Sequence, residues 1–111
     1  MKTRHYQFGG MGTKEAMRRY YSSLVVQLTR LKMSSRKEKD KLVLNDSENG
    51  TDIHLYHPEE RKGVYWGPKI EISGEDDNSI RKTLGKLERA LPFCITQLPD
   101  DAELLAGATD E

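Results

Sequence analysis

The sequence predicts a small α+β domain: two helices pack on one face of a three-stranded antiparallel meander, and a short C-terminal appendage follows. Two helical patterns flank three short β-like runs, so the elements follow in the order α-β-β-β-α. The chain has 111 residues, the size of a single domain. We expect a flexible N-terminal arm (1–12), an α+β domain (13–98) and an acidic C-terminal tail with a helical turn (99–111).

The composition favours a small folded core with solvated ends. Leu, Ile, Val and Phe make up about 21% of the chain, close to the level of about 20% at which chains stop folding. The formal net charge is zero, whereas disorder usually combines low hydrophobicity with high net charge.

The first helix is expected from Thr13 to about Met33, after a glycine-rich stretch (1–12) without helical or strand periodicity. Apolar and aromatic side chains recur there at spacings of three and four, which predicts an amphipathic helix. They are Met17, Tyr20, Tyr21, Leu24, Val25, Leu28 and Leu31. Thr13 is a suitable N-cap, and Arg30 and Lys32 suit the C-terminal end of the helix dipole.

Three short strands are expected next, over 41–45, 51–57 and 64–73, after a solvated connection (34–40) that has no apolar residue. In the second run, Ile53 and Leu55 alternate with Asp52, His54 and Tyr56, so the two sets face opposite sides. Gly67-Pro68 interrupts the third run, which predicts a bulge or an edge position there.

A second helix is expected after the acidic start 74–78 and up to Leu91, where Pro92 stops it. Its apolar stripe consists of Ile80, Leu84, Leu87 and Leu91. Phe93–Thr96 is expected to add a short edge strand.

Several function classes find no support in the sequence. It has no glycine-rich phosphate loop, no GxSxG elbow and no HExxH motif, so we expect a non-catalytic protein without a cofactor. His54 and His57 are three apart on a strand and face opposite sides, so no metal site is expected. The single Cys94 excludes an internal disulfide. No apolar run is long enough for a membrane span and no signal peptide is evident, so a soluble cytoplasmic protein is expected.

The charge is strongly asymmetric along the chain. Residues 1–41 carry a net charge of +8 and residues 42–111 a net charge of −8. A local basic surface attracts polyanions whatever the total charge, so the first helix and its connector are candidates for phosphate contacts. Those candidates are Arg18, Arg19, Arg30, Lys32, Arg36, Lys37, Lys39 and Lys41. The alternative is that the two halves neutralise each other.

The outward face of the sheet offers a second candidate surface. His54 and Tyr56 are expected there, joined by Tyr65 from the neighbouring strand and by Lys69. Trp66 is a further candidate, and the break at Gly67-Pro68 leaves open which face it takes. Aromatic rings flanked by cations are used to stack the bases of single-stranded nucleic acid. The alternative is that these aromatics only stabilise the sheet or contact a protein.

The order α-β-β-β-α resembles the double-stranded RNA-binding domain. That family contacts phosphates through a basic cluster at the start of its second helix, whereas residues 74–79 are acidic here. The resemblance therefore covers the order of elements and implies no RNA-binding residue in this chain.

Two functions follow as hypotheses. The first is a small regulatory protein that binds RNA or DNA, or associates with it, through the basic surface and the sheet aromatics. The alternative is a protein-interaction module, an inhibitor or adaptor, that binds one target through exposed Tyr and Trp side chains. A homodimer through the apolar side of the first helix is also expected to be feasible.

Overall fold

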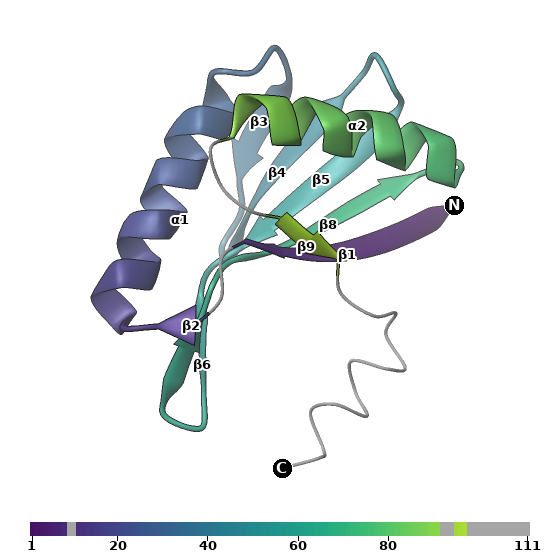
Figure 1. The fold of residues 1–111 in the computed structure, drawn as a ribbon. Helices are drawn as coiled ribbons and strands as arrows, with labels where there is room; N and C mark the ends of the chain where they lie inside the picture. The colour runs from purple at the N-terminus through teal and green to yellow at the C-terminus, as the bar shows by residue number, and fades with distance from the viewer. Residues whose placement is uncertain (9–10, 92–94, 98–111) are drawn as a thin grey trace.

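The computed structural model describes residues 1–8, 11–91 and 95–97. It confirms the predicted α+β class: two helices and mostly antiparallel sheets form one small domain (Figure 1). The helices are α1 (Lys14–Thr29) and α2 (Asp77–Ala90). The strands are β1 (Lys2–Phe8), β2 (Met11–Gly12), β3 (Ser34–Lys37), β4 (Lys41–Asp46), β5 (Thr51–Tyr56), β6 (Glu59–Arg61), β7 (Val64–Trp66), β8 (Lys69–Gly74) and β9 (Ile95–Gln97).

The main sheet has the order β3-β4-β5-β8-β1-β9, with every neighbouring pair antiparallel. The predicted meander is its centre, formed by β4, β5 and β8. A smaller sheet with the order β2-β7-β6 lies beyond one end of these strands (Figure 1).

The third predicted strand, 64–73, is corrected to two strands in two sheets. β7 ends at Trp66 in the small sheet, and β8 begins at Lys69 in the main sheet. The break falls at Gly67-Pro68, where the sequence predicts an interruption, because proline has no N–H for the ladder. The Pro68 carbonyl instead accepts a hydrogen bond from the N–H of Phe8 at 3.0 Å.

The expected N-terminal arm is corrected as well, since Lys2–Phe8 form β1 inside the main sheet, between β8 and β9. Tyr6 is 4% exposed and Phe8 is fully buried. The strand is held by ladder bonds to segments far along the chain, which no local periodicity reveals.

The connector 34–40 is corrected in part, because Ser34–Lys37 form β3, the edge strand beside β4. Each residue of β3 is exposed. Backbone pairing with β4 therefore stabilises this strand. Because β3 contains no apolar residue, its sequence shows no strand pattern.

The helix starts agree with their predicted caps, and the ends are shorter than predicted. The Thr13 side chain accepts a hydrogen bond from the N–H of Ala16 at 3.1 Å, and Asp76 accepts one from the N–H of Ser79 at 2.8 Å. α1 ends at Thr29, so Lys32 lies beyond the helix.

One face of the main sheet packs against both helices and forms the core. Leu24 and Leu28 of α1 and Ile80 and Leu87 of α2 belong to one core cluster with the apolar residues of this face, and all four are almost fully buried. The apolar side of α1, on which the expected homodimer depends, thus belongs to the core of its own domain.

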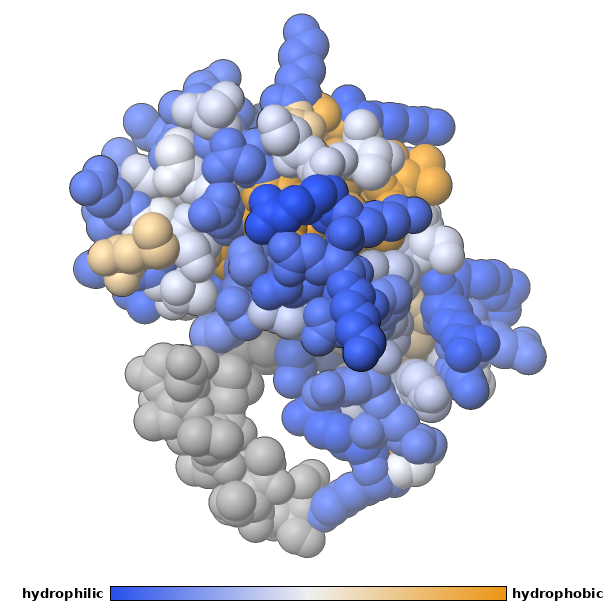
Figure 2. All heavy atoms as spheres, turned by 180° about the vertical axis from the view of Figure 1, so that it is seen from behind, coloured by the Kyte–Doolittle hydropathy of each residue, from blue (hydrophilic) through white to orange (hydrophobic). Residues whose placement is uncertain are grey.

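The other face carries polar side chains at alternate positions. Ile53 and Leu55 point into the core, and His54 and Tyr56 lie half-buried on the open side. This is the alternation that the sequence predicts. Figure 2 views the molecule from this side, where hydrophilic residues cover most of the surface.

Of the expected strand over Phe93–Thr96, Ile95 and Thr96 are described and belong to β9, which pairs with β1, and Phe93 lies outside the described residues. Cys94 and the expected tail (99–111) lie outside the described residues. Among the helices that are described, none has both the length and the apolar character needed to cross a bilayer.

Candidate functional site

The predicted basic residues at the side of the main sheet lie on two elements that the fold brings together. Arg18 is exposed on α1, one turn before Ser22 on the same helical face. Lys37 of β3 pairs with Leu42 of β4 and so points to the same side of the sheet as α1. Lys39 is exposed in the turn between these two strands, the β3–β4 hairpin.

Most of the predicted phosphate-contact residues have no carboxylate partner. Arg36 lies 2.9 Å and Lys41 lies 3.9 Å from oxygens of Glu38, and Lys69 lies 3.1 Å from Glu59. No other predicted cation takes part in an ion pair within the described part of the chain. These cations are Arg18, Arg19, Arg30, Lys32, Lys37 and Lys39, and all of them are exposed. Their charges are therefore available to an external anion.

A cleft of about 260 Å³ lies between α1 and the β3–β4 hairpin. Val25 of α1 and Leu42 of β4 supply apolar walls. The charged lining consists of Lys37, Lys41 and the carboxylate of Glu38, which is ion-paired with Arg36 and Lys41. The remaining lining of the cleft includes Tyr21 and His57, whose rings stack with centroids 4.4 Å apart. The cleft thus combines aromatic and apolar surface with positive charge.

From the sequence, Tyr21 is expected only as part of the apolar side of the first helix and His57 only as a strand residue that faces away from His54. His57 follows Tyr56, which points to the open face, and so turns back toward α1. The alternation places His54 and His57 on opposite sides of the sheet, as expected. Across the described residues, no group of three metal-ligating side chains is present.

Lys41 belongs mainly to the open face. Its ammonium donates a hydrogen bond to Nδ1 of His54 at 3.1 Å and lies 5.7 Å from the ring centroid of Tyr56. The hairpin therefore presents Lys37 on the helix side and Lys41 on the open side.

The open face does not form the expected platform of aromatic rings and cations. Glu71 lies near its centre, between His54 and His5 in the cross-strand register. Burial, with the charge of Glu71 and a hydrogen bond to it, raises the pKa of Tyr56 to about 12. The Glu71 carboxylate repels phosphate at the centre of this face, whereas the Glu38 carboxylate of the cleft is ion-paired with Arg36 and Lys41. The open face is therefore a weaker candidate than the cleft side.

The expected neighbourhood of Tyr56 and Tyr65 is corrected, because β7 leaves the main sheet. Tyr65 pairs with Gly12 in the small sheet, and a Cβ on Gly12 would lie 3.1 Å from Met17 of α1. Tyr65 is therefore on the α1 side. Trp66 faces the other way, 5.0 Å from the guanidinium of Arg61, and pairs across from Met11.

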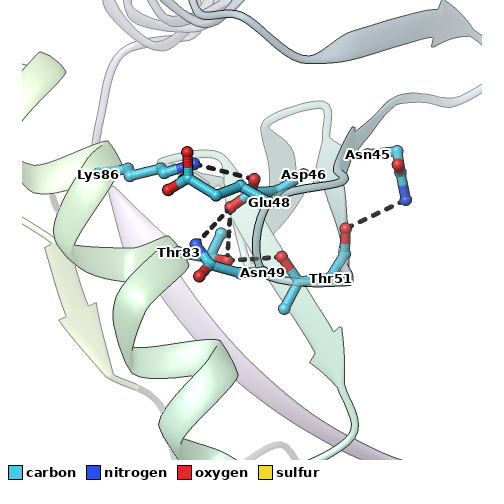
Figure 3. Close-up of polar contacts among 7 residues, drawn as sticks. All are labelled: Asn45, Asp46, Glu48, Asn49, Thr51, Thr83 and Lys86. Carbon is cyan, nitrogen blue, oxygen red and sulfur yellow. Dashed lines mark hydrogen bonds and ion pairs between the residues drawn. The ribbon is translucent and has the colours of Figure 1, made fainter.

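A second basic region forms where α1 and α2 end. A groove of about 450 Å³ brings Lys32 together with Lys86 and Arg89 of α2. Lys86 is committed to structure, since its Nζ lies 3.0 Å from Asp46 and 3.2 Å from Glu48 (Figure 3). The carboxylates in this groove make it less positive than the hairpin side.

No known protein family matches this chain, and no curated protein resembles it. The functional reading therefore comes from the arrangement of its own side chains.

Proposed function

We propose that the protein binds nucleic acid through phosphate contacts on a hairpin surface formed by Arg18 of α1 and the cations of the β3–β4 hairpin. The hairpin cations are Arg36, Lys37, Lys39 and Lys41. The observation that carries the proposal is the exposure of Arg18, Lys37 and Lys39 without a carboxylate partner among the described residues. Five cations in this surface face two neighbouring acids, Glu38 and Asp40.

The hairpin suits phosphate contacts for a physical reason. An edge strand and its turn project lysine and arginine side chains outward, where a polyanion reaches them without displacing the core. Each phosphate contact releases condensed counterions, so affinity falls as salt rises, with a log–log slope of about −0.7 to −0.9 per phosphate. Three contacts give a slope of about −2 to −3.

The test is fluorescence anisotropy of a labelled mixed-sequence oligonucleotide, titrated with the protein at about 50 and about 200 mM salt. The variant Lys37→Glu/Lys39→Glu should lose most of the binding. Arg81→Glu/Lys82→Glu, on the exposed side of α2, is the matched control because it changes the net charge equally. Absence of wild-type binding at low salt, or an equal loss in the control, would contradict the proposal.

A protein-interaction module is the second candidate, and one observation favours it. Met11 is 62% exposed and pairs directly with Trp66, which packs under Arg61 on the same face of the small sheet. Met, Trp and Arg are enriched in protein interfaces. Under this hypothesis, cross-linking to the target protein persists at high salt. It is lost in Trp66→Ala and retained in Lys37→Glu/Lys39→Glu.

A further inference from the structure

We infer that the cleft between α1 and the β3–β4 hairpin receives one unpaired base of a single-stranded nucleic acid. This inference rests on the proposed function and adds the ligand class to it: a single strand is bound in preference to a duplex. Three properties of the cleft carry it.

The first property is an aromatic wall. Tyr21 is half-buried against the domain and His57 is exposed, and their rings stack at 4.4 Å with an interplanar angle of 30°. Every base has a flat π face that stacks on such rings regardless of sequence. A base in the cleft therefore extends a stack that the protein already holds in place.

The second property is the shape and size of the cleft. Val25 and the buried Leu42 line it beside the aromatic pair. Sites for drug-sized ligands span about 300–1,000 Å³, whereas this cleft has about 260 Å³. It suits a single planar ring system, which loses contact with water on entering.

The third property is the position of the cations. Lys37 lines the cleft beside Glu38, whose carboxylate is ion-paired with Arg36. Arg18 lies one turn before Ser22, which also lines the cleft. Phosphates flank each base of a strand, so Lys37 and Arg18 lie where the backbone passes the opening. Bases of a duplex are paired inside the helix and do not reach such a cleft without being extruded.

The experiment compares three labelled ligands of equal length: a mixed-sequence single strand, its duplex, and a strand without bases. The variant His57→Ala should weaken binding of the single strand about tenfold, which corresponds to the loss of one stacked base. It should leave binding of the strand without bases unchanged. His5→Ala is the matched control, because it removes the same side chain from β1 on the open face of the sheet, away from the cations of the hairpin surface.

A second readout uses the wild-type protein alone and does not depend on how a variant folds. The ring resonances of His57 should shift on addition of the single strand, whereas those of His5 and His54 stay in place. Trp66 emission should be unchanged, since this residue packs under Arg61 in the small sheet.

The outcomes separate this inference from the proposed function. Unchanged single-strand affinity in His57→Ala, with lost affinity in Lys37→Glu/Lys39→Glu, would overturn the base site and retain phosphate binding. Duplex binding as tight as single-strand binding would also overturn it. So would a free mononucleotide that displaces the strand at equal molar concentration, since the cleft would then be a nucleotide site. No binding of any ligand would remove both proposals.

Discussion

The Nζ atom of Lys86 lies 3.0 Å from Oδ1 of Asp46, a residue that is only 1% exposed at the end of β4. Asn49 and Thr83 donate to the second oxygen of this carboxylate at 2.8 and 3.0 Å, and Thr83 also contacts the hydroxyl of Thr51 (Figure 3). The network ties α2 to the turn between β4 and β5. The five side chains satisfy one another's hydrogen-bonding groups there, as a buried polar group requires.

Stability should fall in acid partly through Asp46. Burial raises the pKa of Asp46, but hydrogen bonds from Lys86, Asn49 and Thr83 outweigh it and hold the pKa below its usual value. A lowered pKa stabilises the fold above the unfolded value of about 3.9, and this stabilisation is lost as the pH falls toward the folded value. Asp46→Asn should cost about 1–3 kcal/mol at neutral pH. Urea unfolding from neutral to acidic pH should show that the gap between wild type and variant narrows; a constant gap would be incompatible with this role.

Thr83→Val tests the hydroxyl in the same network. The substitution keeps the shape of a fully buried side chain and removes the donor to Asp46. An unsatisfied buried polar group costs about 1–3 kcal/mol, so the free energy of unfolding should drop by about that amount. Thr83→Ser retains the hydroxyl and is the matched control. Equal losses in the two variants would assign the effect to packing.

Tyr56 should be among the last tyrosines to ionise, because its pKa is about 12. A raised pKa means that its stabilising effect is complete below the unfolded value of about 10 and is lost as the pH rises toward about 12. Tyr56→Phe has no phenol to ionise, so its free energy of unfolding should fall less at alkaline pH than that of the wild type. Tyr65→Phe is the control. Thermal unfolding at increasing pH measures this difference. Parallel curves of melting temperature against pH for the wild type and Tyr56→Phe would disprove the prediction.

Two glycines should respond to alanine with opposite signs. A Cβ on Gly74 would lie 2.8 Å from the Thr51 side chain inside the core, so Gly74→Ala should destabilise the fold by about 1–3 kcal/mol. Gly85 lies within α2, where a Cβ meets only the flexible end of Arg89 at 3.4 Å. Gly85→Ala should therefore stabilise the fold by about 0.5–1 kcal/mol. Melting temperatures that move in the same direction would contradict this account.

The elements that the sequence predicts well are those whose burial is periodic. The helical stripe that contains Ile80 and Leu87 and the alternation of Ile53 and Leu55 both indicate a face turned to the core. β1 and β3 were missed because backbone pairing with other strands defines them, and β3 has no apolar residue at all.

The candidate site was predictable in its charges and not in its geometry. The basic connector predicts Lys37 and Lys39 as candidates. The Tyr21–His57 stack joins α1 to the residue after β5, and the sequence does not show that these two segments lie together. The expected contact between Tyr56 and Tyr65 failed because one break at Gly67-Pro68 moved Tyr65 to another sheet. Alternation within a strand does not reveal which sheet the strand joins.

The place of β1 has a consequence for biosynthesis. Both of its neighbours, β8 and β9, come from the last part of the described chain, and the hydroxyls of Thr3 and Ser73 meet across 70 positions of sequence. Tyr6 and Phe8 therefore leave the ribosome long before the segment that covers them. Pairing of such distant segments slows folding relative to a helical bundle, because a long loop must close first. The nascent chain therefore carries β1 as an unpaired aromatic strand until β8 has been synthesised, and such an exposed strand edge is prone to aggregation during this interval.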